Sequence, residues 1–257
     1  MTDLAGRVAL VVGASRGIGA ASARALADAG ASVAVAARDR DALERLAATI
    51  RDEGGSAEAI PADVTSEESI ARLVERTVAR FGRLDAALNN AAGGGHAPTP
   101  LADVTLEQYQ SALDVSLSGV FLGLKYEIPA MLESGRGAIV NMASTAGLQA
   151  VAGMAGYVSA KHGVIGLTRT AALDYAARGI RVNAIAPGPI LTDRLEQAGP
   201  EAQRQAGMAM PMQRVGRPHE VADAVVWLLS DRSSYVTGMT LEVDGGKLAG
   251  IAPFSRG

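Results

Sequence analysis

The stretch RVALVVGASRGIGAASARALADAG, residues 7–30, decides the fold. Its first seven residues form a short apolar run, which is typical of a strand buried on both faces of a sheet. Glycines follow at positions 13, 17 and 19, and small and apolar residues then continue in a helical pattern to Gly30. A strand, a glycine-rich turn and a helix in this order predict a phosphate site, because the free N–H groups of the helix N-terminus face the turn.

Strand and helix patterns alternate along the rest of the chain. This alternation is typical of a parallel sheet with helices on both faces. No repeat, linker or low-complexity segment interrupts it, so we expect one doubly wound (Rossmann) α/β domain over residues 1–257. The predicted strands are 7–13, 32–37, 57–63, 84–90, 137–144, 180–188 and 239–246, and the predicted helices are 17–30, 41–55, 66–82, 157–178 and 219–230.

The composition excludes several kinds of protein. The chain has no cysteine, which excludes disulfides, a thiol nucleophile and cysteine metal ligands. The histidines, His96, His162 and His219, are widely separated and lack the spacing of metal ligands, so we expect no metal site. A net charge of −3 argues against a general nucleic-acid-binding role.

The sequence also predicts no secretory or membrane segment. The N-terminus has an early acidic residue and an apolar run too short for a secretory signal. Residues 137–160 carry no charge and are long enough to span a bilayer, but they contain five polar side chains and four glycines. We interpret them as a buried strand followed by a loop, and we expect a cytoplasmic protein.

The residues after the second strand favour NADP(H) as the cofactor. That strand ends at Ala37, which has no carboxylate for a ribose 2′-hydroxyl, whereas Arg38 follows it and Arg16 lies in the glycine loop. Two guanidinium groups would stabilise a 2′-phosphate through charge-assisted bonds. Asp39 lies about 20 residues after the last glycine, where an NAD-selective acid would stand. Alternatively, Arg38 and Asp39 are an ordinary charged start to a helix.

Tyr157 and Lys161 raise a second question. Their spacing of four places both side chains on one face of a helix. A solvated surface pair would have the same spacing. A phenol beside an ammonium group, however, is suited to proton transfer.

Taken together, these motifs resemble the short-chain dehydrogenase/reductase family over essentially the whole length of the chain. The matching motifs are GASRGIG at 13–19, Asp63-Val64, NNA at 89–91, Ser144 thirteen residues before Tyr157, Tyr157-x3-Lys161, PG at 187–188 with Thr192, and DGG at 244–246.

The resemblance implies a fold and a set of site residues. The sheet would have seven strands, mostly parallel, and the enzyme would be a carbonyl reductase or alcohol dehydrogenase that uses NADP(H). Ser144, Tyr157 and Lys161 would be catalytic. The cofactor would contact Gly13, Ser15, Arg16, Gly17, Ile18, Gly19, Arg38, Asp63, Val64, Asn90, Ala91, Tyr157, Lys161, Pro187, Gly188, Ile190 and Thr192.

The chain departs from the family pattern at three positions. Val12 replaces the usual threonine before the first glycine, and Ala92 stands where NNAG has its glycine. Ser116 replaces an asparagine whose backbone carbonyl holds a proton-relay water in the family. Serine keeps the carbonyl but lacks the amide side chain, so Ser116 is the candidate relay residue.

The residue types suit the implied chemistry. Hydride transfer to a ketone leaves an alkoxide that needs a proton, and a free tyrosine is a weak acid at neutral pH. A cation at about 4 Å favours the phenolate by about 4 kcal/mol at an effective dielectric of about 20, whereas burial opposes ionisation. Ser144 would then hydrogen-bond the substrate oxygen and the phenol.

The region between the strand at 180–188 and the next helix predicts a substrate lid at about 190–217. Its three methionines suit an irregular apolar surface, so we expect an apolar or bulky ketone or secondary alcohol as the substrate. These methionines could instead pack on the protein's own core. The predicted pocket residues are Leu148, Met154, Met208, Met210 and Met212.

Three alternatives remain at this stage. The first is reduction of a 3-oxoacyl thioester on an acidic carrier protein, for which lid arginines at 194, 204, 214 and 217 would be the contacts, although ordinary solvated arginines explain them equally well. The second is a sensor that binds NADP without turnover. The third concerns assembly: small residues at 163, 166, 171 and 172 permit packing between subunits, and the family often forms homotetramers, but tight packing inside one chain would use the same residues.

Overall fold

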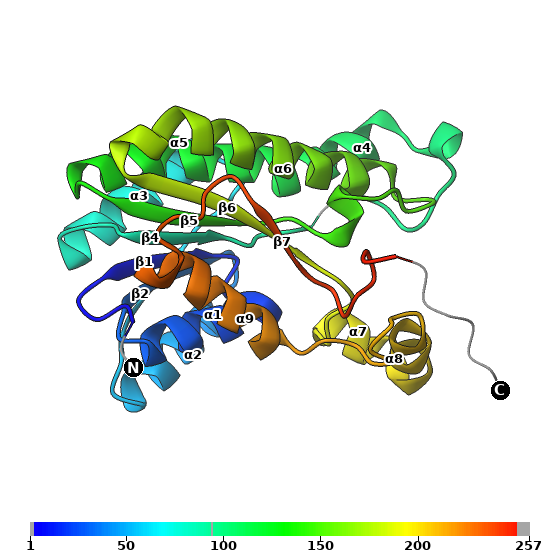
Figure 1. Ribbon diagram of the computed structural model, residues 1–257, viewed down its shortest axis with the longest axis horizontal. Coiled ribbons are helices and arrows are strands. Elements are labelled where there is room, and N and C mark those ends of the chain that lie inside the picture. The colour runs from blue at the N-terminus through cyan, green and yellow to red at the C-terminus, as the bar shows by residue number, and fades with distance from the viewer. Residues whose placement is uncertain (1–2, 94, 251–257) are drawn as a thin grey trace.

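A computed structural model describes residues 3–93 and 95–250, and within these ranges a seven-stranded parallel sheet forms the centre of the molecule (Figure 1). The strand order is β3-β2-β1-β4-β5-β6-β7. The order turns back at β1, so that the chain builds first one half of the sheet and then the other. The strands are β1 (Val8–Val12), β2 (Ser32–Ala37), β3 (Ser56–Pro61), β4 (Ala86–Asn89), β5 (Gly137–Met142), β6 (Ile180–Pro187) and β7 (Thr240–Val243).

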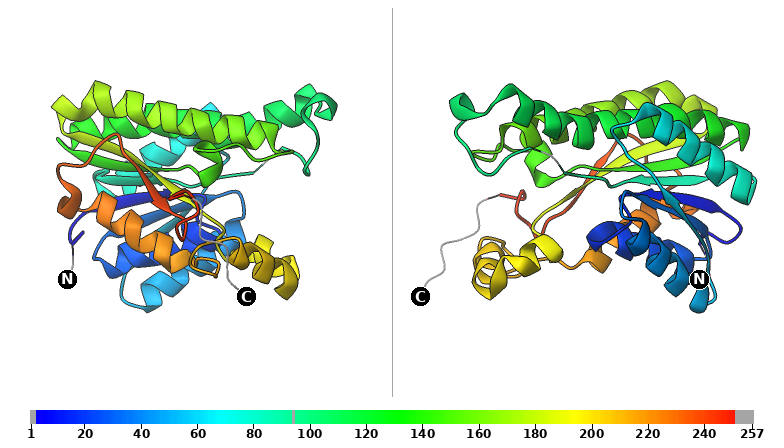
Figure 2. Two further views of the ribbon diagram at one scale, coloured as in Figure 1. Left: turned by 45° about the vertical axis from the view of Figure 1, so that its right-hand side comes forward. Right: turned by 180° about the vertical axis from the view of Figure 1, so that it is seen from behind.

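Two helical layers cover the two faces of the sheet, as the views in Figures 1 and 2 show. Each layer closes its own apolar core, because the central strands are buried on both faces. One layer contains α1 (Gly17–Asp28), α2 (Arg40–Asp52) and α9 (Pro218–Leu229). The other contains α3 (Glu67–Phe81), α4 (Leu106–Leu113), the π-helical turn η2 (Asp114–Ser118), α5 (Gly119–Glu133) and α6 (Ala155–Tyr175).

The predicted lid is a separate excursion between β6 and α9. It contains α7 (Asp193–Gln197) and α8 (Gly199–Met208), which lie away from the sheet (Figure 2). A bridge between Ile190 and Gly216 closes its base, and the N–H of Leu191 donates to the carbonyl of Gly216 at 2.8 Å. This excursion covers the predicted segment 190–217, whose role as a substrate lid stays a prediction.

All twelve predicted strands and helices are present, with ends that differ from the prediction by at most three residues. Ser66 caps α3, since its side chain accepts a hydrogen bond from the N–H of Ser69. The sequence patterns gave no bounds for the helices between β4 and β5. The continuous helical stretch 106–133 is long and apolar enough to cross a membrane by length and composition. We assign it as a core helix, because α5 packs on the sheet with Val120, Leu124 and Ile128 buried.

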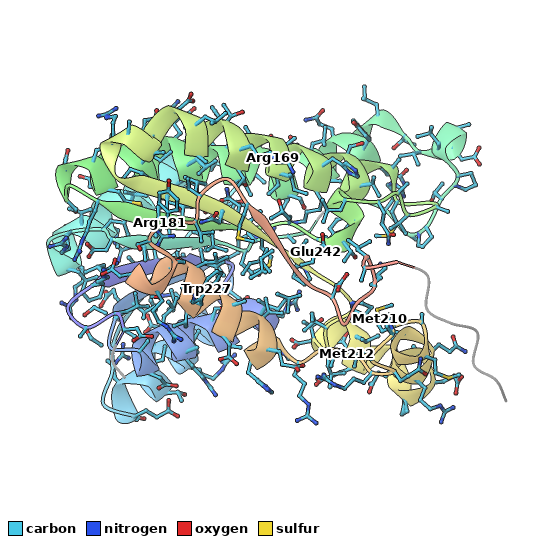
Figure 3. The ribbon with its side chains drawn as sticks, viewed as in Figure 1. Arg169, Arg181, Met210, Met212, Trp227 and Glu242 are labelled. Atoms are coloured by element: carbon cyan, nitrogen blue, oxygen red, sulfur yellow. The ribbon has the colours of Figure 1, made fainter. Side chains whose placement is uncertain are left out.

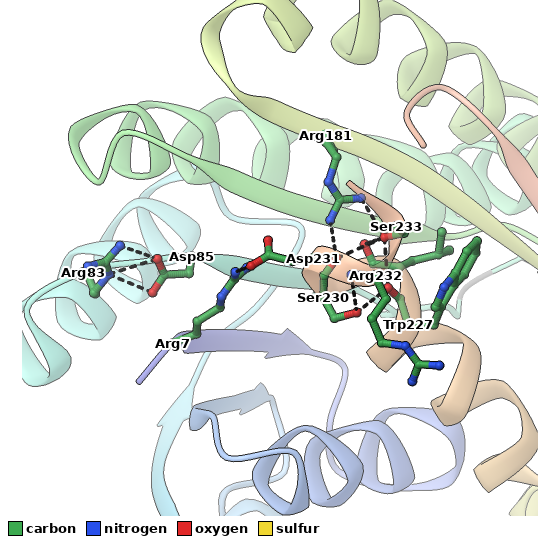
Figure 4. Close-up of polar contacts among 10 residues, drawn as sticks. Arg7, Arg83, Asp85, Arg181, Trp227, Ser230, Asp231, Arg232 and Ser233 are labelled. Carbon is green, nitrogen blue, oxygen red and sulfur yellow. Dashed lines mark hydrogen bonds and ion pairs between the residues drawn. The ribbon is translucent and has the colours of Figure 1, made fainter. Parts of the chain in front are cut away.

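Ion pairs hold the end of the sheet at which the strands begin (Figure 4). Arg7, just before β1, pairs with Asp231, and Arg83 binds both oxygens of Asp85 at 2.6–2.9 Å. Arg181 of β6 donates to Ser233 Oγ and to backbone carbonyls of the loop before β7. These contacts are structural, because they lie at the opposite end from the carboxyl ends of the strands.

Candidate active site

A cavity of about 260 Å³ opens at the carboxyl ends of β4, β5 and β6. In parallel sheets this edge is where ligands bind. Nine residues named from the sequence line the cavity, together with Ala92, Met142 and Ala143, which were not predicted. The nine are Ile18, Asn90, Ser144, Tyr157, Lys161, Pro187, Gly188, Ile190 and Thr192.

The glycine loop packs against the end of β4 through backbone contacts. A Cβ on Gly13 would lie 2.6 Å from the backbone nitrogen of Ala91, and a Cβ on Gly19 would lie 2.0 Å from the carbonyl oxygen of Gly13. Asn90 Nδ2 donates to that same carbonyl at 2.9 Å. Glycine is therefore required at 13 and 19 for the loop to close over the strand ends.

The N-terminus of α1 has no side chain to cap it. Asp39, Ser66 and Thr105 cap α2, α3 and α4, but the N-cap residue of α1, Arg16, makes no such bond. The first N–H groups of a helix need an acceptor, and an anionic pyrophosphate is a suitable one. Gly17 lies beside Thr192, since a Cβ there would lie 3.1 Å from Thr192 Cγ2. The loop and the helix end thus fit a dinucleotide.

Asp63 and Arg38 lie outside the cavity lining but close enough for their charges to interact. Asp63 accepts hydrogen bonds from the Thr65 N–H and hydroxyl, and these bonds, with a smaller contribution from the charge of Arg38, lower its pKa against the effect of burial. Val64 packs against the start of α5. Asp39 caps α2 by accepting from the N–H of Ala42 at 3.0 Å, so its carboxylate is the acid of a helix start.

Ser144, Tyr157 and Lys161 meet in the cavity. Ser144 lies in the loop just after β5, where its Oγ accepts from the N–H of Ala146 at 3.1 Å. Lys161 Nζ lies 5.7 Å from the centroid of the Tyr157 ring. Lys161 is only 1% exposed, its Nζ donates to the carbonyl of Met142 at 2.7 Å, and burial lowers its pKa to about 8. The Lys161 ammonium group can therefore lose or regain its proton close to neutral pH.

Ser116 lies outside the cavity lining. It is buried in the π-helical turn η2, and its Oγ donates to the carbonyl of Gly93 at 3.3 Å. π-Helical turns occur often at functional sites because they interrupt the regular ladder of backbone bonds. The structure does not bring the Ser116 side chain to Lys161, and its relay role stays a prediction.

The predicted substrate residues also lie outside this cavity lining. Leu148 is exposed, and Met208 and Met212 are 70% and 58% exposed. Met210 is buried where the lid meets the segment after β7 (Figure 3). The N–H of Met212 donates to the carbonyl of Gly245 in that segment. Met154 precedes α6 and is half-buried.

The lid arginines whose side chains the structure describes are largely paired. Arg204 pairs with Glu201, and Arg214 binds both oxygens of Glu220 at 2.6 and 2.8 Å. The bond from Arg214 and then the backbone N–H of Arg217 lower the pKa of Glu220 to about 2. The side chain of Arg194 lies outside the described part of the structure. These pairs leave little basic charge for an acidic partner.

The described residues hold no group of three or more His, Cys, Asp or Glu side chains that could bind a metal ion. Two of the histidines instead lie near backbone carbonyls: His96 Nδ1 is 2.7 Å from that of Ala97, and His162 Nδ1 is 2.9 Å from that of Val158.

Comparisons with known proteins identify the family of this chain. The family model described as Enoyl-(Acyl carrier protein) reductase matches residues 13–247. A 2,5-dichloro-2,5-cyclohexadiene-1,4-diol dehydrogenase of Sphingobium indicum is 45% identical over 96% of this chain and 98% of its own length. An A-factor type gamma-butyrolactone 1'-reductase of Streptomyces virginiae is 46% identical, with the same coverage. The crystal structure of a levodione reductase superimposes with a TM-score of 0.92 at 36% identity, covering 96% of this chain and 100% of that one.

This chain belongs to the short-chain dehydrogenase/reductase family. It is an oxidoreductase that interconverts a ketone and a secondary alcohol, as its relatives among the dehydrogenases and reductases indicate.

Proposed function

We propose that the protein reduces an apolar or bulky ketone to a secondary alcohol with NADPH, using Ser144, Tyr157 and Lys161. The convergence of these three side chains in one cavity beside the glycine loop is the observation that supports this most directly. The substrate names of the relatives add support for a ring-bearing ketone or alcohol.

The cofactor is held by the glycine loop and the strand ends. The uncapped N-terminus of α1 would hold the pyrophosphate, and Pro187, Gly188, Ile190 and Thr192, which line the cavity, would contact the nicotinamide. When bound, the nicotinamide supplies or accepts the hydride. Arg38 favours a 2′-phosphate, and Asp39 does not oppose this through its carboxylate, since that group caps α2.

The three side chains divide the proton chemistry. Ser144 Oγ orients the substrate oxygen, and Tyr157 donates the proton that this oxygen needs as the carbonyl becomes an alcohol. Lys161 lies beside the tyrosine ring and lowers the cost of leaving a phenolate behind. The carbonyl of Met142 fixes the Lys161 ammonium in place.

Replacing Tyr157 with phenylalanine tests this assignment. Y157F is expected to lose at least about 10³-fold in kcat, since the proton donor is removed, while NADPH affinity changes little. Y175F, at the other end of α6, is the matched control and keeps wild-type turnover. Both are measured as NADPH oxidation over a panel of cyclic, aryl and open-chain ketones. Undiminished turnover by Y157F would contradict the assignment.

Two other functions are separated by the same assays. The family description names an acyl carrier protein, so a 3-oxoacyl thioester belongs in the substrate panel. A higher kcat/KM on that thioester than on cyclic ketones would favour the carrier-bound substrate. A wild-type protein that binds NADPH but oxidises it with no carbonyl would favour a sensor.

We further propose that the enzyme acts in the cytoplasm as a homotetramer. Its substrate is a small molecule, with no nucleic-acid or membrane partner. The net charge of −3 argues against a nucleic-acid partner.

A further inference from the structure

A network of buried hydrogen bonds links two helices to two central strands whose carboxyl ends line the active-site cavity. It begins at Glu127 of α5, whose Oε2 accepts from Asn89 Nδ2 at 2.9 Å. The same Nδ2 donates to Asn141 Oδ1 at 3.1 Å, and Asn141 Nδ2 donates to Thr168 Oγ1 at 3.0 Å. Thr168 completes the chain by donating to the carbonyl of Val164 at 2.8 Å. The bonds therefore join α5, β4, β5 and α6.

The residues of this hydrogen-bond network are buried and closely packed, and the orientation of the Asn89 amide is fixed by its partners. Glu127, Asn141 and Thr168 are fully buried, and Asn89 is 3% exposed. Gly123, one turn before Glu127, lets Asn89 approach α5, because a Cβ there would lie 2.5 Å from Asn89 Oδ1. The Asn89 amide nitrogen donates to both Glu127 and Asn141, so the acceptor at Glu127 fixes the orientation of this amide.

Each of the two asparagines in this hydrogen-bond network directly precedes, in sequence, a residue that lines the active-site cavity. Asn89 precedes Asn90, which binds the glycine loop, and Asn141 precedes Met142, whose carbonyl accepts from Lys161. Thr168 lies two turns after Lys161 on the same face of α6. β5 and α6 are thus tied at two places: by Asn141 with Thr168, and by Met142 with Lys161.

We propose that Glu127 is a positioning residue for Lys161. By orienting the Asn89 amide, it keeps Asn141 bonded to Thr168, and this holds the carbonyl of Met142 beneath the Lys161 ammonium. Glu127 touches neither the cavity lining nor Lys161, so its effect passes through the strand and the helix. Among the described residues no ion pair reaches Glu127, and its Oε1 has no hydrogen-bond partner. The proposal rests on the role proposed above for Lys161.

Breaking the chain at either end tests the proposal. E127L removes the acceptor at similar volume, T168V removes the hydroxyl with its shape kept, and E127Q keeps an acceptor oxygen for Asn89. E127L and T168V are expected to lower kcat about tenfold and to shift the pH midpoint assigned to Lys161, with NADPH affinity within about twofold of wild type. E127Q is expected to retain most of the wild-type kcat, because its amide oxygen can still accept from Asn89. The double variant E127L/T168V should have a kcat no lower than that of the less active single variant, because both substitutions break the same hydrogen-bond network.

Two matched controls separate positioning from general destabilisation. Thr77 on α3 is equally buried and donates to the carbonyl four residues earlier at 2.8 Å, but it bonds to no strand side chain, so T77V should leave kcat and its pH midpoint unchanged. E133Q changes an exposed glutamate on the same helix as Glu127. A folded E127L or T168V with wild-type kcat and midpoint overturns the proposal. If E127L does not fold, T168V decides.

A readout without turnover keeps this test apart from the proposed function. The rate at which a small amine-reactive reagent labels Lys161, followed against pH by peptide mass spectrometry, reports the state of its ammonium group. A shifted labelling midpoint in T168V but not in T77V supports the positioning role even if every ketone in the panel fails. Equal midpoints in the two variants overturn it.

Discussion

Lys161 combines a charge with almost complete burial, which costs stability unless the charge is paired and hydrogen-bonded. Its one described hydrogen bond runs to a backbone carbonyl, and a tyrosine ring lies beside it. The site therefore sacrifices folding free energy to hold a cation beside a phenol, which is a common trade at catalytic centres.

The pH dependence of reduction should follow Lys161. Its pKa is lowered to about 8, so the cation is present below that pH and is lost above it. Because the cation supports proton donation by Tyr157, kcat/KM for the ketone is expected to fall as the pH rises through about 8. Steady-state rates from pH 6 to 10 measure this, and a flat profile across that range would contradict the assignment.

Arg38 should determine the choice of cofactor. R38A is expected to raise KM for NADPH tenfold or more, because a charge-assisted bond of about 1.5–3 kcal/mol is lost, and to affect NADH less. R40A, two residues further along the same exposed segment, is the control and should change neither constant. Equal effects of R38A on both cofactors would rule out the 2′-phosphate contact.

Residue types point to side chains that can share a site, but they do not reveal backbone partners. Helical spacing placed Tyr157 and Lys161 on one face, and the family resemblance added Ser144 and the catalytic roles, which stay predictions. The partner of Lys161 is the carbonyl of Met142, and a carbonyl leaves no mark on residue type. The sequence left open whether Arg38 and Asp39 serve a cofactor or form an ordinary charged start to a helix. Asp39 caps α2, and the cofactor role of Arg38 stays a prediction.

Among the elements, α5 carries the least expected group, the buried carboxyl of Glu127. Burial raises its pKa from 4.5 to about 7. A raised pKa stabilises the folded state fully below pH 4.5, and that contribution is lost as the pH rises through about 7. The shift corresponds to about 3 kcal/mol.

The unfolding free energy should therefore show this titration. Between pH 4.5 and 8, wild type is expected to lose about 3 kcal/mol relative to E127Q, which does not titrate there. Urea unfolding of both proteins at several pH values measures the difference, and E133Q should follow wild type. A constant gap between wild type and E127Q would show that Glu127 has an ordinary pKa.

Strands were easier to predict than the lid. Continuous apolar runs such as β1 have few other interpretations, whereas a methionine marks an apolar neighbourhood without saying which one. Met210 is buried against the segment after β7, while Met208 and Met212 are largely exposed. The sequence pattern thus marked the segment between β6 and α9 as apolar in part but did not place these side chains relative to the cavity.

For the whole molecule, the outer face of α6 is the clearest candidate contact between subunits. A Cβ on Gly166 would meet nothing within 4 Å, and Leu173, two turns later on the same face, is 84% exposed. An exposed leucine beside a bare glycine suits close helix packing between copies.

Substitutions on this face should change assembly without unfolding the subunit. Wild type is expected to sediment as a tetramer, and L173E as a smaller species with an unchanged circular dichroism spectrum. L101E, at an equally exposed leucine outside α6, should stay tetrameric. A monomeric wild type, or no difference between the two variants, would contradict this interface.

The strand order has a consequence for synthesis on the ribosome. β1 pairs with β2 on one edge and with β4 on the other, yet β4 is made only after β3 is complete. A nascent chain that has emerged as far as β3 can form three strands while one edge of β1, its most buried strand, stays open. We expect this stage to depend on chaperones or rapid elongation, because an open apolar edge invites pairing with other chains.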